Sequence, residues 1–294
     1  MAPAARRDVG TKGAGGHRNR VAGVTIALVL WATASVTVAQ PDRQMVAAGG
    51  TLEYIAHAAF LIRSPGGIEL LIDPYAGAVW LGYEFPLGLE PDAVLITHPH
   101  YDHDGGRFRG GTPWWDEGMR IIDAPGRYEV GDVRVHGISG KHADPYGEEF
   151  GQRNTIMVIE VAGIRLAHIG DNGPLTPENL GEMGPIDILM LPIDGDEHIL
   201  SNDAVESAIA AIRPRILIPM HYRIPELETS PDSPSDLGEI DPWLEGRTNV
   251  ERLTSNQIVL GPDTLPATPT IMVFRHSPAV PGAPGLIGAR RESR

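Results

Sequence analysis

A cluster of three histidines and one aspartate constrains the fold of this chain more than any other sequence feature. It follows Ala93–Thr97, an apolar run typical of a buried strand. His98 and His100 are two residues apart, so on an extended backbone their side chains project to the same side. Asp102 and His103 follow once the chain begins to turn, and so point elsewhere. This arrangement favours two neighbouring metal ions, with two of these ligands for each.

The absence of cysteine limits the chemistry of such a site. It excludes disulfides, thiolate metal sites, iron–sulfur clusters and cysteine nucleophiles. Any metal must be held by His, Asp or Glu, and these ligands suit zinc, manganese or iron. The formal net charge of -14 argues against a nucleic-acid partner, because phosphate binding needs clustered Lys and Arg. We therefore expect a small-molecule substrate.

The N-terminal segment has the features of a secretory signal peptide. Residues 1–20 hold five Lys or Arg side chains and one Asp, and Val21–Ala39 has no charged residue. A basic region, an apolar region and small residues before Gln40 are typical of an export signal. We expect cleavage of residues 1–39, a periplasmic or extracellular protein, and no stable membrane insertion afterwards. The alternative is an uncleaved N-terminal membrane anchor.

Short strands dominate the first half of the chain, and strands alternate with helices later. That mixture predicts an α/β architecture in which helices cover sheets. We expect one catalytic domain over residues 40–276, a surface loop over Glu226–Gly246 and a disordered tail over residues 277–294. Helices are expected to begin at Thr176-Pro177 and to span Asn202–Ile212. The predicted strands are Leu52–Ala56, Ala59–Arg63, Ile68–Ile72, Ala93–Thr97, Ile121–Asp123, Val133–Ile138, Thr155–Val161, Ile164–Ile169, Ile186–Leu191 and Arg215–Met220.

The pattern His98-x-His100-x-Asp102-His103 resembles the signature of the metallo-β-lactamase superfamily. Three further residues, each just past a predicted strand, extend the resemblance in the family's order; they are His142, Asp171 and His221. The likeness spans about Thr51 to Phe274. It implies a four-layer αβ/βα sandwich of two mixed β-sheets with outer helices.

The resemblance also implies a role for each of these side chains. The first metal would bind three histidines, the second an aspartate and two histidines, and one aspartate would bridge both. In that order they are His98, His100 and His142, then Asp102, His103 and His221, and finally Asp171. A hydroxide between the metals would be the nucleophile, and Asp102 would orient it.

Four other residues attract attention beside this set. The stretch around His57 resembles the subgroup of ascorbate-6-phosphate lactonase-like and N-acyl-phosphatidylethanolamine phospholipase D-like enzymes, which implies a histidine near the site. A catalytic and a structural role for His57 both remain open. Asp73 matches the superfamily's first motif and is expected to orient a ligand loop; His168 is expected to be a buried supporting histidine. Asn172 stands where the family often has Thr, and it can still form hydrogen bonds.

These features together predict a hydrolase with two divalent metal ions, zinc first and manganese or iron as alternatives. The expected substrates are small esters, lactones, amides or phosphodiesters. The short interval from His103 to His142 favours the lactonase-like subgroup over true β-lactamases. Two other interpretations stay open: an iron-dependent oxidoreductase on the same fold, and a non-catalytic metal-binding protein. The substrate and the oligomeric state are left undetermined.

Overall fold

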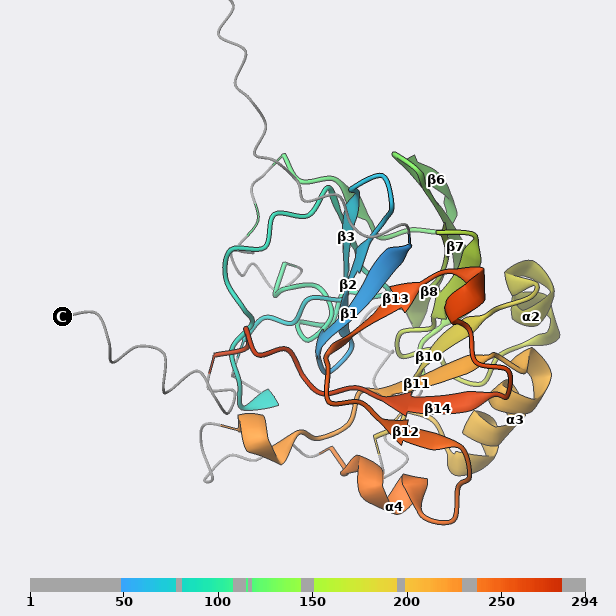
Figure 1. Ribbon diagram of the computed structural model, residues 1–294. Helices are drawn as coiled ribbons and strands as arrows, with labels where there is room; N and C mark the ends of the chain where they lie inside the picture. Colours follow the sequence, from blue (N-terminus) through green and yellow to red (C-terminus); the bar gives the residue numbers. More distant parts are fainter. Residues whose placement is uncertain are drawn as a thin grey trace, which may run out of the picture. The chain divides into compact units, whose positions relative to one another are not determined.

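Two mixed β-sheets form the framework of the protein (Figure 1). The computed structural model describes residues 49–77, 81–107, 115, 118–143, 151–194, 199–228 and 237–281, all within one compact unit, residues 43–294. The predicted signal segment 1–39 and residues 282–294 of the predicted tail lie outside the described residues. Among the described residues, no helix has the length and apolarity needed to cross a membrane.

The first sheet, sheet A, has six strands and holds the N-terminal part of the described chain. Its order is β13 (Gln257–Leu260), β1 (Gly50–Ala56), β2 (Ala59–Arg63), β3 (Glu69–Ile72), β4 (Ala93–Leu95) and β5 (Ile121–Ile122). The pairs from β13 to β3 are antiparallel, whereas β3, β4 and β5 are parallel. The central strands are buried along almost their whole length, as expected for a sheet covered on both faces.

The second sheet, sheet B, has eight strands. Its order is β12 (Val250–Arg252), β14 (Thr270–Val273), β11 (Ile216–Met220), β10 (Ile188–Pro192), β9 (Ile164–His168), β8 (Arg153–Val161), β7 (Val133–Lys141) and β6 (Gly126–Val130). Neighbouring strands from β6 to β9 are antiparallel. The remaining neighbours, from β9 through β10, β11 and β14 to β12, are parallel. The α/β prediction with two mixed sheets is therefore confirmed.

The described part of the chain contains few helices, and two of them lie on the outer side of sheet B, away from sheet A (Figure 1). α2 (Pro177–Met183) begins with the predicted Thr176 cap, whose hydroxyl accepts from the Asn179 amide while the Asn179 side chain accepts from the Thr176 amide. α3 (Asn202–Ile212) has the predicted bounds. The described residues also contain α4 (Ile240–Leu244) and two short 3-10 helices, η2 (Pro225–Leu227) and η3 (Pro262–Thr264).

The prediction of a surface loop over residues 226–246 is wrong in part. α4 forms inside this segment, and Leu227, Leu237 and Trp243 are buried. The high Pro, Ser and Asp content of the segment led to the prediction of a loop, although a few of its apolar side chains pack against the core. The chain also continues to pack beyond residue 276, since the Ser277 amide donates to the Ile55 carbonyl and Val280 is buried. The domain boundaries themselves stay a prediction.

Three hydrogen bonds join the two sheets at one end of the molecule. The His168 side chain contacts the Ala58 carbonyl at 2.9 Å, the Thr155 amide donates to the Thr97 carbonyl, and the His221 amide donates to the His57 carbonyl. The turns that follow β1, β3, β4, β7, β9 and β11 meet at this end. Loops at such a seam are held by a rigid scaffold, which makes the seam a suitable place for a site.

Candidate metal centre

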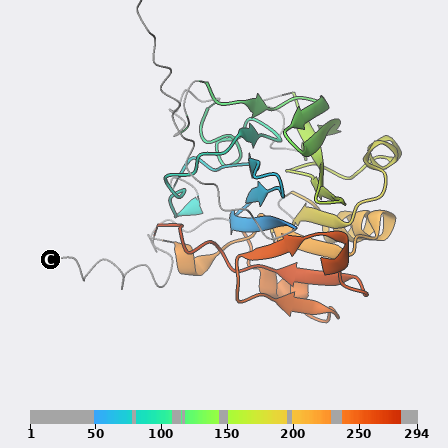
Figure 2. The ribbon, with the colours of Figure 1, turned by 45° about the horizontal axis from the view of Figure 1, so that its top comes forward.

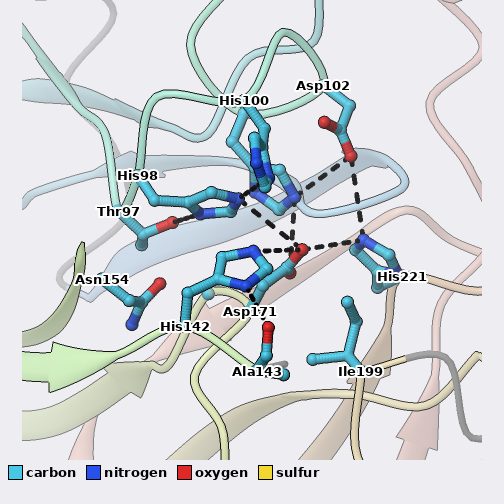
Figure 3. Close-up of polar contacts among 12 residues, drawn as sticks. Thr97, His98, His100, Asp102, His142, Ala143, Asn154, Asp171, Ile199 and His221 are labelled. Atoms are coloured by element: carbon cyan, nitrogen blue, oxygen red, sulfur yellow. Dashed lines mark hydrogen bonds and ion pairs between the residues drawn. The ribbon is translucent and has the colours of Figure 1, made fainter. Parts of the chain in front are cut away.

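All seven predicted metal ligands converge where the two sheets meet. Figure 3 labels each of them except His103. They form two adjacent groups, and within each group one ligand atom per residue lies within 4.8 Å of the others. The groups are His98, His100, His142 and Asp171, and His57, Asp102, His103 and His221. The second group includes His57, which the sequence placed near the site without a settled role. Metal binding by these residues stays a prediction.

Asp171 lies between the two groups. Its Oδ2 is 3.6 Å from His98 Nε2, 3.7 Å from His142 Nε2 and 3.3 Å from His221 Nε2. Its Oδ1 is 3.4 Å from His103 Nε2. This carboxylate comes from the turn after β9, at the end of a parallel strand in sheet B. The sequence-based expectation of a shared aspartate therefore has the geometry that it needs.

Hydrogen bonds to Nδ1 orient two of the imidazoles toward Asp171. His98 Nδ1 lies 3.0 Å from the Thr97 hydroxyl, which itself donates to Asp73 Oδ2. His103 Nδ1 lies 2.8 Å from the same Asp73 oxygen. Because Nδ1–H can donate in both rings, each Nε2 faces inward, where it can offer a lone pair to a metal ion. Asp73 thus supports two ligands and contacts them from behind, as its motif position led us to expect.

The turn that carries His142 is held by features that the sequence did not reveal. His142 Nδ1 contacts the Ala143 carbonyl at 2.8 Å, so its Nε2 also faces inward. The Asn172 side chain accepts from the Lys141 amide at 3.0 Å and from Asn154 Nδ2 at 3.1 Å. The Asn172 side chain therefore links the His142 turn to the loop that carries Asp171. Asn172, at the position where the family often has Thr, was the sequence signal for this link.

The two remaining predicted histidines are both fully buried. His57 Nε2 lies 3.1 Å from Asp102 Oδ2, and its ring centroid is 4.2 Å from that of His221. Burial and the neighbouring His221 lower the pKa of His57 to about 3, so the ring is neutral. His168 holds the β1–β2 turn through the Ala58 carbonyl and accepts from the Gly170 amide. Its contacts match the expected supporting role, with no direct place in either ligand group.

The charges of the site suit bound cations. Burial raises the pKa of Asp102 and Asp171, but the neighbouring histidines, with His103 the largest contributor, together outweigh burial and hold both pKa values well below the ordinary range. Both carboxylates are therefore anionic, although they are buried. Burial lowers the pKa of His103, and the charges of Asp171 and Asp102 more than reverse this and raise it well above its ordinary value. Among the described residues, the ion-pair partners of these two carboxylates are all histidines.

Buried polar atoms without hydrogen bonds give an independent test of the fit to metal ions. Within the described residues, His103 Nε2, His142 Nε2 and Asp171 Oδ1 have no hydrogen-bond partner. Leaving such atoms unsatisfied is costly, and native proteins do so where another ligand completes the site. All three atoms face the space between the two groups. Nitrogen and carboxylate donors in this arrangement fit zinc, manganese or iron.

The accessible side of the centre lies at His100, the one half-buried histidine of the set. The Asp102 side chain is 8% exposed, whereas the His98 and His103 side chains are fully covered. A separate cavity of about 520 Å³ shares only His98 with the centre and is bounded by Arg107, Asp123 and Arg153. Thr97 and Asn154 also line that cavity, and no proposed metal ligand other than His98 does.

A family model described as a β-lactamase superfamily domain matches residues 51–221, more than half of the chain. The chain belongs to the β-lactamase superfamily. UPF0173 metal-dependent hydrolases are among its relatives. The protein from Methanosarcina mazei is 31% identical over 195 residues, which cover 58% of this chain and 82% of the relative. The protein from Myxococcus xanthus is 31% identical over 211 residues, covering 60% and 72% respectively.

A solved structure from Thermotoga maritima supports the superfamily fold. That protein, provisionally assigned as a Zn-dependent hydrolase of the metallo-β-lactamase superfamily, superposes with a TM-score of 0.58. The two chains share 24% identity, and the alignment covers 78% of this chain and all of the other. At this identity the likeness shows the fold. The relatives confirm the expected class, a metal-dependent hydrolase of the superfamily, while the finer lactonase-like subgroup stays a prediction.

Proposed function

We propose that the chain is a dinuclear metallohydrolase that cleaves a small ester, lactone, amide or phosphodiester. Asp171 carries the proposal, because its carboxylate faces imidazoles of both ligand groups at 3.3–3.7 Å. A carboxylate with two outward-facing oxygens is suited to share two cations. The proposed ligands are His98, His100 and His142 for the first metal, Asp102, His103 and His221 for the second, and Asp171 for both.

The side chains of the centre divide the work of hydrolysis. Bound divalent metal ions would act as Lewis acids, lowering the pKa of water and polarising the carbonyl or phosphoryl oxygen of the substrate. The anionic Asp102 lies at the accessible side, where it orients the attacking water by accepting a hydrogen bond from it. Substrate enters past His100. Water adds across one C–O, C–N or P–O bond: its oxygen and one proton stay with the acyl or phosphoryl product, and its other proton passes to the leaving group.

Zinc is the metal that we propose first. Neutral imidazoles and carboxylates bind it well in the absence of thiolates, and the same donors also accept manganese or iron. The proposed set has no main-chain carbonyl ligands of the kind that calcium sites use. The choice among the three metals therefore depends on their supply in the compartment where the chain folds.

We further propose that the protein is exported and acts on a small molecule. The basic residues of segment 1–20 and the uncharged run Val21–Ala39 support export, and the acidic composition supports a partner other than nucleic acid. Mass spectrometry of the protein isolated from its native cells should find an N-terminus near Gln40. Protein that retains Val21–Ala39 and sediments with membranes would favour the anchored alternative.

Metal analysis coupled to a substrate panel tests the proposed function. The purified chain should hold close to two metal ions and should hydrolyse at least one member of a panel of lactones, phosphodiesters and N-acyl lipids. Activity should collapse in His100→Ala and Asp171→Ala. His136→Ala, in β7 but outside both groups, is the matched control and should stay active. Full activity in metal-free protein would refute the proposal, and bound iron with visible absorption would favour an oxidoreductase.

A further inference from the structure

His57 occupies a backbone position that its side chain does not favour. The register of β1 and β2 pairs Ala56 with Ala59, so His57 and Ala58 form a two-residue turn. Of these two, only His57 has a positive φ, at +57°. Hairpin turns with a positive φ at their first residue favour glycine there. A fully buried histidine in this place points to a role outside the turn itself.

The contacts of His57 described above join it to the second ligand group. Its Nε2 is 3.1 Å from Asp102 Oδ2, closer than the Nε2 atoms of His103 at 3.3 Å and His221 at 3.8 Å. Its carbonyl accepts from the His221 amide at 3.1 Å, and the two rings pack against each other. One residue of the β1–β2 turn therefore touches both Asp102 and His221, two of the four ligands proposed for the second metal.

We propose that His57 is a positioning residue whose Nε2–H holds the Asp102 carboxylate in place for the second metal ion. This inference rests on the proposed dinuclear function. A neutral imidazole has one N–H, and an anionic carboxylate is its strongest available acceptor. With the proton on Nε2, that nitrogen has no lone pair for a metal. His57 therefore acts through Asp102, and its loss weakens the second site more than the first.

Two amide substitutions separate this role from the alternatives. In His57→Gln the amide nitrogen reaches the place of imidazole Nε2 and can donate to Asp102. In His57→Asn the side chain is one methylene shorter and cannot reach. Asn tolerates a positive φ better than Gln. The stability of the turn therefore favours the Asn variant, whereas the hydrogen bond to Asp102 favours the Gln variant.

The experiment measures zinc binding of the full chain by competition with a chromophoric chelator, together with urea unfolding of the metal-free protein. We expect His57→Asn to weaken the second zinc about 10–100-fold, the usual effect of removing a group that orients a metal ligand. The first zinc should bind as in the wild type. His57→Gln should retain most of the second-site affinity, although its metal-free fold is the less stable of the two.

Several results would overturn the inference. Equal loss of second-site affinity in both variants would indicate that His57 binds the metal directly. Unchanged binding in His57→Asn would leave His57 without a role at the second site. Affinities that follow unfolding stability, with Asn above Gln, would indicate a structural role alone. A wild-type chain that binds one zinc refutes the dinuclear function as well, which distinguishes that failure from the other three.

Discussion

Asp73 offers the sharpest test of how the metal centre is held together. It is fully buried, and its Oδ1 accepts from the Thr97 amide while its Oδ2 accepts from the Thr97 hydroxyl and from His103 Nδ1. The substitution Asp73→Asn keeps the volume and one oxygen. It places an NH₂ group against two donors, and only the Thr97 hydroxyl can rotate to accept from it. His103 Nδ1–H is left without an acceptor.

The expected loss follows from that one orphaned donor. A buried donor without a partner costs about 1–3 kcal/mol of unfolding free energy in the metal-free protein. His103 can escape by moving its proton to Nε2, but this nitrogen faces Asp171 at 3.4 Å and is the proposed metal donor. Loss of such an orienting partner weakens metal binding about 10–100-fold, or about 1.4–2.7 kcal/mol.

Urea unfolding in a chelator measures the first quantity, and competitive zinc titration measures the second. Asp132→Asn is the matched control, because Asp132 likewise accepts from one hydroxyl and one main-chain amide, those of Ser64 and Gly66, at the β2–β3 turn. It should leave zinc affinity unchanged. The reasoning would be refuted if Asp73→Asn unfolded at the wild-type urea concentration and bound zinc like the wild type.

Three further predictions concern packing, metal and pH. Gly140→Ala brings a Cβ to 1.9 Å from Asn172 Oδ1 and should lower the free energy of unfolding, measured in urea, by about 1–3 kcal/mol. The control Gly181→Ala, in α2 with open space around it, should raise the free energy of unfolding by about 0.5–1 kcal/mol. Equal effects of the two substitutions would contradict tight packing between Gly140 and Asn172. Removal of metal by a chelator should lower the melting temperature, and added zinc should restore it. Added magnesium should not, because imidazoles suit zinc whereas magnesium requires oxygen ligands. Recovery with magnesium would contradict the proposed histidine ligands. The fold lowers the pKa of His57 from 6.5 to about 3, so between these pH values the unfolded chain binds a proton that the folded chain does not. The free energy of unfolding of the metal-free protein should therefore fall by up to about 1.4 kcal/mol per pH unit as the pH drops from 6.5 toward 3. His57→Gln should flatten that slope, and an unchanged slope would show that His57 is not the titrating group.

Local pattern was enough to predict the elements whose apolar faces are buried. β2 and α3 have the predicted bounds, because each combines an apolar face with a clear turn or cap at its end. The site histidines were predictable for a related reason. Each follows a strand, so strand position brought His98, His142 and His221 to one end of the molecule. The ordered motifs predicted seven of the eight residues that gather in the two groups as metal ligands, and metal binding by them stays a prediction.

Exposed strands and cross-strand contacts were not predictable in this way. β12 and β13 are largely exposed, and β14 is only half-buried. The apolar runs of β13 and β14, Ile258–Leu260 and Ile271–Phe274, are too short to distinguish a strand from another element by pattern alone. The edge strand β6 alternates glycine, charge and aromatic residues. The link from Asn154 to Asn172 joins β8 to the loop after β9, and its existence depends on the register of a sheet assembled over long range.

The segment from β12 to β14 has a consequence for how the protein is made. β13 pairs with β1 in sheet A, while β14 pairs with β11 in sheet B, so this short stretch closes a border of each sheet (Figure 1, Figure 2). A ribosome delivers it after every other strand of the described residues. Until then β1 and β11 each expose a row of unpaired backbone groups, the kind of edge that recruits other chains. The nascent protein therefore passes through a window in which chaperone capture and aggregation compete for the same two edges.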